Sequence, residues 1–403
     1  MPATKTTILQ EVIKMRFESI YDRYNKNELT NEEAADILGI SCRTFRRKKV
    51  RYEEEGFSGL LDRRIGNMPP NKVPVDEVEK MLKLYEDKYY DFSPKHFHSH
   101  ISKNHSYTRS YNFVRLALQG SGLVAKLTPR KPKHRLKRPR KPMAGMMIHQ
   151  DGSTHKWIAN LGYYPDLIVT MDDATNEIYS AFLVDEEGTF SSMRGIQEVI
   201  TNRGLFSSFY VDRGSHYAHT PEAGGKVDKN NPTQVGRALK QLGIQLIHAY
   251  SPEARGRSER MFGSLQKRLP QEFRLNEITT IRDANIYLKE VFIPEYNAEF
   301  QQTAEIKEET AFVPYIGRDL QDILSIQEER TVAKDNTVSY KNRILQIPSD
   351  NQRYHYVKCR VMVHEYGNGE LAIFHGARKL AKYAKDGKRI DESDLAKANK
   401  LAA

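Results

Sequence analysis

The spacing of hydrophobic and polar residues changes twice along the chain. Over residues 5–66, and again over 71–125, the apolar positions are typical of helices. From residue 146 to about 300, short apolar runs alternate with helical patterns, which predicts a mixed α/β domain. Short strand-like runs return between 331 and 384. With 403 residues, the chain is expected to fold into two to four domains.

The middle part contains five predicted strands and four predicted helices. The strands are Gly145–Gln150, Asp166–Met171, Ile178–Val184, Ser207–Val211 and Gln245–Ala249. The helices are Ser191–Asn202, Thr233–Leu242, Pro252–Leu269 and Ile281–Tyr296. In the third helix, Ser251-Pro252 is a start signal and Pro270 is a stop signal, because proline supplies no backbone N–H. In the last part, strands are predicted at Thr337–Ile347, Val357–Glu365 and Glu370–His375, with a hairpin turn at Gly367-Asn368-Gly369.

Residues 29–52 have the pattern of a helix-turn-helix. Thr30 and Ser41 are expected to cap the two helices, and Gly39 stands where the turn needs a positive φ. The predicted small core consists of Ala34, Ile37, Ile40 and Phe45. Three arginines of the second helix are expected to face DNA phosphates or guanine edges: Arg43, Arg46 and Arg47. The alternative is a helical hairpin with a solvated basic face.

A second helical unit is introduced by Pro69-Pro70. Residues 107–118 are predicted as a second recognition helix, which contains Arg109 and Arg115. Four histidines precede it: His96, His98, His100 and His105. Their spacing places at most two on one helical face and no cysteine accompanies them, so a zinc site is not expected here. We expect them to line a DNA-facing or half-buried helix.

The segment from Lys126 to Pro142 is the clearest linker. Proline keeps it extended, and its density of positive charge favours contact with a phosphate backbone. Its expected DNA contacts are Arg130, Lys131, Arg135, Arg138 and Arg140. The alternative is a solvated tether without a ligand.

Composition supports an anionic partner and argues against several other classes. The chain has 63 Lys and Arg against 52 Asp and Glu, a net charge of +11. Cys42 and Cys359 lie far apart, so neither a disulfide framework nor a cysteine zinc site is expected, and a reducing cytosol suits them. There is no signal peptide and no apolar run approaches about 20 residues, so we expect no membrane segment. No phosphate-binding G-x-x-x-x-G-K-[ST] motif occurs, so a nucleotide cofactor is not expected.

Three acidic residues stand on separate predicted elements. Asp151 and Asp212 each follow an apolar strand-like run, and Glu259 lies at the rim of the apolar stripe of helix 252–269. Three nearby carboxylates repel one another unless cations or protons neutralise them. Their all-oxygen donors suit Mg²⁺ or Mn²⁺ rather than zinc. The alternative for Glu259 is a surface ion pair with Arg255.

Other acids compete for this role. Asp172-Asp173, followed by Ala-Thr-Asn, is typical of a hairpin turn. Glu253 is expected in the first turn of its helix, where a carboxylate stabilises the helix dipole without a catalytic role.

The order Asp151, Asp212, Glu259 resembles the catalytic core of DDE transposases and retroviral integrases. The segment Tyr250-Ser-Pro252-Glu-Ala-Arg-Gly256-Arg-Ser-Glu259-Arg looks like the family's proline-to-glutamate segment. Residues 151–155 and Tyr296-Asn297 resemble bacterial insertion-sequence transposases, particularly the ISNCY type. The gap of 47 positions from Asp212 to Glu259 is longer than in integrases, and residues 219–231 look like an inserted loop that accounts for it.

The resemblance implies a multidomain fold: all-α helix-turn-helix units, an α/β RNase H-like (integrase catalytic) core and a small all-β SH3-like C-terminal barrel. The expected domains are residues 1–66 and 67–125 (DNA-binding helices), 126–145 (basic linker), 146–300 (catalytic core), 301–330 (connector), 331–385 (barrel) and 386–403 (tail).

The function implied is that of a DNA transposase, which binds the terminal inverted repeats of an insertion sequence and then cleaves and transfers strands. Asp151, Asp212 and Glu259 would be catalytic and would hold two Mg²⁺ or Mn²⁺ ions, with Asp151 as the bridging ligand. Expected phosphate contacts near them are Arg255, Arg257 and Lys267. Expected partners are double-stranded DNA, both transposon ends and target, and further copies of the chain in a dimer or larger assembly in the prokaryotic cytoplasm. The alternatives are a metal-dependent nuclease without joining activity and a DNA-binding regulator with a vestigial core.

Overall fold

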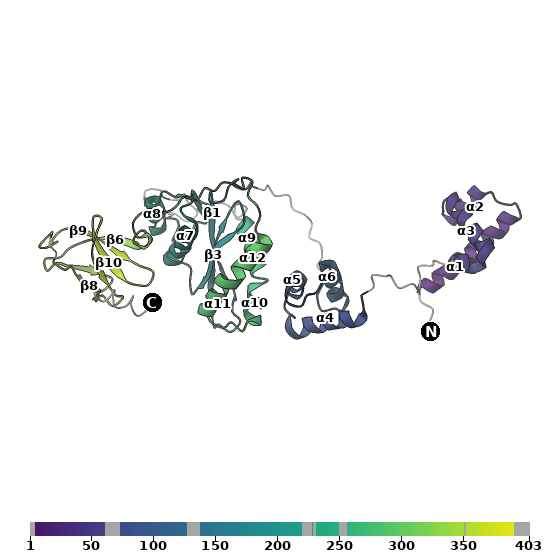
Figure 1. Ribbon diagram of the computed structural model, residues 1–403, viewed down its shortest axis with the longest axis horizontal. Helices are drawn as coiled ribbons and strands as arrows, with labels where there is room; N and C mark the ends of the chain where they lie inside the picture. Colours follow the sequence, from purple (N-terminus) through teal and green to yellow (C-terminus); the bar gives the residue numbers. More distant parts are fainter. Residues whose placement is uncertain are drawn as a thin grey trace. The chain divides into compact units, whose positions relative to one another are not determined.

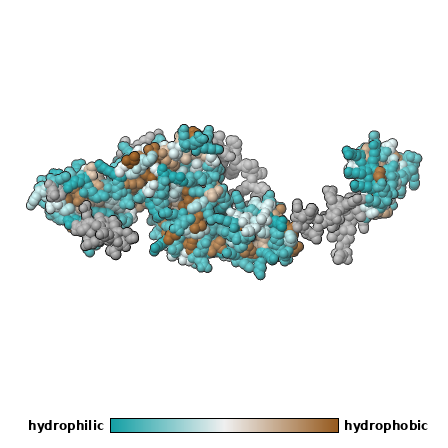
Figure 2. All heavy atoms as spheres, viewed as in Figure 1, coloured by the Kyte–Doolittle hydropathy of each residue, from teal (hydrophilic) through white to brown (hydrophobic). Residues whose placement is uncertain are grey.

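The computed structural model describes residues 5–60, 73–126, 138–219, 228, 231–249, 256–349 and 352–390. The chain forms two compact units, Met1–Met81 and Leu82–Ala403, and each is described by itself (Figure 1). Hydrophilic residues predominate on the faces seen in Figure 2. Among the described helices, none has the length and apolar character needed to cross a membrane.

The first unit contains the predicted helix-turn-helix. It is built from α1 (Lys5–Asn25), α2 (Asn31–Leu38), α3 (Cys42–Glu55) and a 3₁₀ turn, η1 (Gly56–Leu60). The Thr30 hydroxyl accepts a hydrogen bond from the Glu33 N–H at 3.3 Å and the Glu33 carboxylate accepts one from the Thr30 N–H at 2.8 Å, a capping box. Ser41 caps α3, and Gly39 adopts φ 67° between the two helices. The predicted caps and turn are confirmed.

The core of this unit differs from the prediction at one position. Ala34 and Phe45 are fully buried as expected, together with Phe17 and Ala35. Ile37 is 38% exposed, because the buried stripe of α2 runs through Ala34, Ala35 and Leu38 and leaves Ile37 at its edge. The prediction of Ile37 as a core residue was wrong.

The helices that follow are α4 (Val75–Lys88), α5 (Pro94–Asn104) and α6 (Tyr111–Gly120). Serines cap the last two: Ser93 accepts a hydrogen bond from the His96 N–H, and Ser110 accepts one from the Phe113 N–H. Helix α6 corresponds to the predicted second recognition helix. Aromatic rings fill the core beside α5, among them Tyr85, Tyr89, Phe92 and Phe97.

The middle part folds around a five-stranded sheet. Its strands are β1 (Ile148–Thr154), β2 (Asp166–Asp172), β3 (Ile178–Val184), β4 (Ser208–Val211) and β5 (Gln245–His248). Their order in space is β3-β2-β1-β4-β5, in which β1, β2 and β3 form an antiparallel meander while β4 and β5 run parallel to β1. This is the RNase H-like arrangement that was expected.

Helices cover both faces of this sheet (Figure 1). Helices α7 (Thr189–Arg203) and α8 (Gln234–Gln241) pack on the face that includes Ile148 and Phe209. The other face packs against four helices and a π turn: α9 (Gly256–Leu265), α10 (Leu269–Leu275), α11 (Ile281–Tyr287), η3 (Leu288–Phe292) and α12 (Ile293–Phe300).

The sequence suggested that Pro270 stops a helix, and this prediction was wrong. Helix α9 already ends at Leu265, and Pro270 lies in the first turn of α10, where its missing N–H breaks no hydrogen bond. The predicted start at Ser251-Pro252 lies outside the described residues.

Two asparagines complete the hydrogen bonding of the edge strand β3. The Asn297 side chain accepts a hydrogen bond from the Ile178 N–H at 2.8 Å and donates one to the Ile178 carbonyl at 2.9 Å. Asn285 makes the same pair of bonds with Leu183, at 2.6 and 3.0 Å. Each side-chain amide takes the place of a neighbouring strand, so α11 and α12 hold the edge of the sheet.

Asn297→Ala is expected to lower the free energy of unfolding by ~1–3 kcal/mol, because it removes both partners of the Ile178 peptide groups at a part-buried position. Chemical denaturation monitored by circular dichroism measures this change. Asn202→Ala, at an exposed position near the end of α7, is the matched control and should change the free energy by less than ~0.5 kcal/mol. Equal effects of the two substitutions would contradict the bracing role.

The C-terminal part is a small all-β domain preceded by a short helix, α13 (Leu320–Ile323). A five-stranded sheet has the order β12-β11-β10-β9-β6, and β7 pairs with β8. The strands are β6 (Ile326–Thr331), β7 (Thr337–Tyr340), β8 (Arg343–Gln346), β9 (Arg360–Glu365), β10 (Leu371–His375), β11 (Arg378–Tyr383) and β12 (Arg389–Ile390). The hairpin between β9 and β10 turns where predicted, with Gly369 at φ 83°.

Candidate active site

Asp151 and Asp212 lie on neighbouring parallel strands. The register pairs His149 of β1 with Tyr210 of β4, which stand two residues before Asp151 and Asp212 respectively. Side chains two positions apart leave the same face of a strand, and neighbouring strands are ~4.8 Å apart. The rings of His149 and Tyr210 contact each other on that face, with centroids 4.8 Å apart. Asp151 and Asp212 therefore each come two residues after paired positions of neighbouring parallel strands.

The sequence suggested that Asp151 follows the end of its strand, but in the structure the strand continues past it. Strand β1 continues to Thr154 because it pairs with β2 along its whole length, with Asp151 opposite Val169. Asp212 does follow the last residue of β4. One carboxylate is thus held on a central strand and the other begins a loop.

Helix α9, which carries Glu259, lies beside β1. The helix buries Ser258, Met261 and Phe262, and Glu259 is exposed beside this stripe. Gln266 lies in the turn just after α9, and its amide donates a hydrogen bond to the Ser153 hydroxyl at 3.2 Å. Ser153 stands two residues after Asp151 on β1. This hydrogen bond ties the end of α9 to the strand that carries Asp151.

In this arrangement the three carboxylates do not lie as close together as the ligands of one metal ion. Across the ranges that the structure describes, only His96, His100 and Glu272 place three ligand atoms within 4.8 Å of one another. Like charges at such distances repel by several kcal/mol at an effective dielectric constant of ~20. Closer approach of the three acids therefore requires neutralisation of their charge by cations or protons.

A buried network fixes the loop that begins at Asp212. The Tyr217 hydroxyl donates to the Gln150 side chain at 2.6 Å and accepts from the Ser192 hydroxyl at 3.0 Å. Gln150 precedes Asp151, so the network joins the loop to β1 and α7. Within the loop, the Gly214 N–H donates to the Asp212 carboxylate at 2.8 Å. Burial raises the pKa of Tyr217 well above its usual value, so its hydroxyl stays protonated as a donor.

Glu187 is a fourth carboxylate close to Asp151, and the sequence did not single it out. A Cβ atom at Gly152 would overlap the Glu187 carboxylate, so Glu187 packs directly against the backbone that follows Asp151. His216, from the loop after Asp212, lies with Nε2 3.3 Å from Glu187 Oε1. The glycine after Asp151 was the only local signal of this close approach.

Asp173 anchors a buried ion network at the other end of β1. It is fully buried and accepts hydrogen bonds from Arg138, Arg257, His149 at 2.7 Å and the Lys141 N–H at 2.8 Å. Burial alone would raise the pKa of Asp173, but the hydrogen bond and charge of His149, the Lys141 N–H and nearby Arg138 outweigh it, so this pKa lies well below its usual value. The network ties the end of the linker and the start of α9 to the sheet.

Comparison with known proteins finds a helix-turn-helix family and proteins named as transposases. Residues 20–68 match a family model described as a helix-turn-helix domain. A protein named as a transposase, y4bF of Sinorhizobium fredii, is 28% identical over 86% of this chain and 75% of its own length. The transposase for insertion sequence IS1202 of Streptococcus pneumoniae is 25% identical over 85% of this chain and 80% of its own length. The chain is therefore similar over more than four fifths of its length to proteins named as transposases.

Solved structures similar to the chain include retroviral integrases. A chain of the simian T-cell lymphotropic virus intasome matches 72% of this chain and 91% of its own, with 15% identity and a TM-score of 0.34. The trimeric form of the HTLV-2 integrase catalytic core domain, in complex with magnesium, matches 38% of this chain and 90% of its own, with 14% identity and a TM-score of 0.28.

The DNA contacts expected for such a transposase fall into three groups. Exposed basic residues on α3 and after α9 are Arg43, Arg46, Arg47 and Lys267, while Arg109 and Arg115 are half-buried beside and on α6. Engaged inside the protein are Arg138 and Arg257, which bind Asp173, and Arg140, which donates to the Asp173 carbonyl and to Asn176. Outside the described residues lie Arg130, Lys131, Arg135, Arg255 and most of the 219–231 loop. The second group holds the fold together, and we leave it out of the DNA contacts proposed below.

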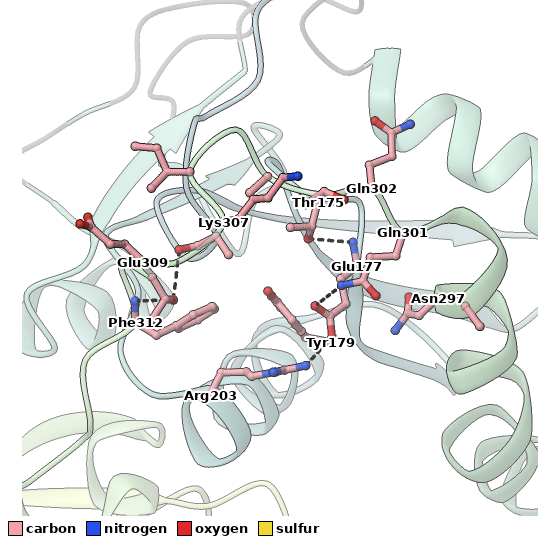
Figure 3. Close-up of a pocket in the computed structure, with 16 residues that line it drawn as sticks. Thr175, Glu177, Tyr179, Arg203, Asn297, Gln301, Gln302, Lys307, Glu309 and Phe312 are labelled. Carbon is pink, nitrogen blue, oxygen red and sulfur yellow. Dashed lines mark hydrogen bonds and ion pairs between the residues drawn. The ribbon is translucent and has the colours of Figure 1, made fainter.

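A cavity of about 610 Å³ lies away from these carboxylates, beside the turn between β2 and β3 (Figure 3). Its polar groups already bind one another: Glu177 pairs with Arg203 and accepts a hydrogen bond from Gln301 at 3.0 Å. The Gln302 N–H donates to the Thr175 carbonyl at 2.7 Å. These contacts attach the segment after α12 to the sheet, and we assign no chemistry to this cavity.

Proposed function

We propose that this protein is a DNA transposase that binds the terminal inverted repeats of its insertion sequence and cuts and joins DNA strands with divalent metal ions. The observation that carries the proposal is the RNase H-like sheet, in which β1, the strand of Asp151, pairs in parallel with β4, the strand that precedes Asp212. The relatives named as transposases, which align with more than four fifths of the chain, support the same function.

The donor set suits magnesium or manganese. Asp151, Asp212 and Glu259 offer only carboxylate oxygens, which these hard cations prefer, and no imidazole or thiolate is needed to complete the site. Two ions bound by these acids would activate an attacking hydroxyl and stabilise the leaving oxygen of a DNA phosphate.

The protein's own contribution is to hold these acids in place. Asp151 lies on a central strand, the loop of Asp212 is fixed through Tyr217, and the first turn of α9, which carries Glu259, is tied to Asp173 by Arg257. Glu259 is exposed, so a DNA backbone could reach it.

DNA ends would be recognised by the amino-terminal helices. Helix α3 presents Arg43, Arg46 and Arg47 to solvent, on the second helix of a helix-turn-helix. Lys267 would contact a phosphate near the carboxylates. Joining two ends to one target requires two copies of the chain or more, so we propose a homodimer or a larger assembly on the DNA.

Arg46→Ala is expected to weaken binding to the terminal repeat by ~1–3 kcal/mol, the value of one base or phosphate contact, and to lower the dependence of affinity on salt. Fluorescence anisotropy at several salt concentrations measures both quantities. Arg23→Ala removes the same charge from an exposed position on α1 and serves as the control. An equal loss in both variants would indicate a general charge effect and count against α3 as the recognition helix.

A strand-transfer assay tests the proposed function. The purified protein is incubated with Mg²⁺, a supercoiled plasmid and a labelled, pre-cleaved terminal repeat. A transposase makes plasmid products that carry the label covalently. A nuclease without joining activity makes only unlabelled nicked or linear plasmid, and a DNA-binding regulator leaves the plasmid intact while still retarding the labelled end.

A further inference from the structure

A second cluster of ligand-type side chains joins α5 to α10, apart from the carboxylate face. His96 and His100 of α5 each place Nε2 2.7 Å from the same oxygen, Oε1 of Glu272 on α10. All three ligand atoms lie within 4.8 Å of one another. His96 and Glu272 are buried and His100 is half-buried.

Helix geometry explains the convergence. The two histidines are four residues apart, so they lie one above the other on the same side of α5. The other two histidines of this region point their nitrogens elsewhere: His98 Nε2 lies 2.9 Å from the Arg109 carbonyl, and His105 Nε2 lies 3.2 Å from the Tyr89 hydroxyl. Local spacing predicted no metal site because the third side chain comes from another helix, 172 residues beyond His100.

Space for a further ligand lies next to the cluster. A cavity of about 800 Å³ is lined by all three side chains and by the polar side chains of Tyr89, His105 and Asn276. Two acids of the lining, Glu295 and Glu299, pair with Lys103 and Arg268. The Tyr287 hydroxyl donates a hydrogen bond to the second oxygen of Glu272, Oε2, at 3.0 Å. This bond fixes the orientation of the carboxylate. Water from the cavity can therefore complete a four-coordinate site.

We propose that His96, His100 and Glu272 bind one zinc ion that fastens α5 to α10. Two imidazole nitrogens, one carboxylate oxygen and one water form a donor set that zinc accepts in tetrahedral geometry. Magnesium is disfavoured because it prefers oxygen ligands in octahedral geometry. The site is independent of the proposed strand transfer and of the ions held by Asp151, Asp212 and Glu259.

Zinc content of the full-length chain tests the site. The protein carries Asp151→Asn, which disables the carboxylate face, and is incubated with Zn²⁺, dialysed and analysed by plasma mass spectrometry. About one zinc ion per chain is expected. Glu272→Gln and His100→Asn should each reduce it to near zero, whereas His98→Asn, on the same helix, should retain it. Zinc near zero in the parent, or an equal loss in the His98 variant, overturns the proposal.

Cobalt binding provides a second test that needs no variant of these residues. Co²⁺ in a four-coordinate site absorbs strongly in the visible range, whereas six-coordinate, all-oxygen sites absorb weakly. In the Asp151→Asn protein we expect strong bands that Zn²⁺ removes by competition, together with a higher melting temperature on adding Zn²⁺. Weak bands only, with no shift in melting temperature, would count against the site even if the Glu272 and His100 variants failed to fold.

Discussion

Asp151→Asn is expected to lower Mg²⁺-dependent strand cleavage and joining by about 10³-fold or more while leaving binding to the terminal repeat unchanged. The substitution keeps the size of the side chain but removes the charge that holds divalent ions, and losing ~4 kcal/mol of transition-state stabilisation corresponds to that factor. Asp212→Asn and Glu259→Gln should have effects of the same order, because the three acids are proposed to act as one site. Labelled repeat DNA measures binding by gel retardation and cleavage on denaturing gels.

Asp185→Asn is the control for these variants. Asp185 is an exposed acid just after β3, and losing it changes the net charge by the same amount. We expect this variant to cleave and join at the rate of the unmodified protein. Full cleavage by any one of the three acid variants would remove that residue from the proposed site, and unchanged activity in all three would end the assignment.

Asp173→Ala is expected to destabilise the fold by ~3–5 kcal/mol, the cost of leaving buried charges without their partner. The carboxylate is fully buried, and Arg257, only 13% exposed in its side chain, has Asp173 as its acidic partner. The same change should loosen the first turn of α9 and reduce cleavage even where the protein remains folded. Urea unfolding followed by tryptophan fluorescence gives the free energy, and Asp185→Ala serves as the exposed control. A loss below ~0.5 kcal/mol would contradict the anchoring role.

Lowering the pH should remove the stabilisation that Asp173 provides, without a mutation. The pKa of Asp173 is lowered in the folded state, so its contribution is fully present above its ordinary value of 3.8 and is lost as the pH falls through the folded pKa. Glu272 behaves alike: its contribution is present above 4.5 and is lost as the pH falls toward about 2. Asp173→Asn should therefore flatten the fall of stability with acid, relative to the unmodified protein.

Local sequence patterns predicted the elements well because the signals that define them are local. Apolar runs located the sheet strands to within a few residues, and Thr30, Gly39 and Ser41 located the helix-turn-helix through capping and turn geometry. Errors arose where neighbours in space decide the outcome. Pairing with β2 extends β1 beyond Asp151, and a break after Leu265 makes Pro270 the start of a helix.

Contacts between distant residues could not be predicted in this way. The carboxylate of Asp173 was interpreted as part of a turn, which it is, but its partners Arg138 and Arg257 come from other segments of the chain. Glu187 approaches Asp151 only because the fold places the start of α7 over Gly152. Glu272 meets two histidines from a helix that precedes the sheet. Charge and residue type suggested that such groups are available, but only the packed structure shows which of them meet.

Manganese binding in crystals tests the central proposal most directly. Crystals of the unmodified protein with terminal-repeat DNA are soaked in Mn²⁺, and anomalous difference maps locate the ions. The account predicts peaks within about 2.2 Å of carboxylate oxygens from Asp151, Asp212 and Glu259, with Asp151 contacting both ions and a DNA phosphate beside them. Manganese bound elsewhere, with these three side chains apart and no phosphate near them, would contradict it.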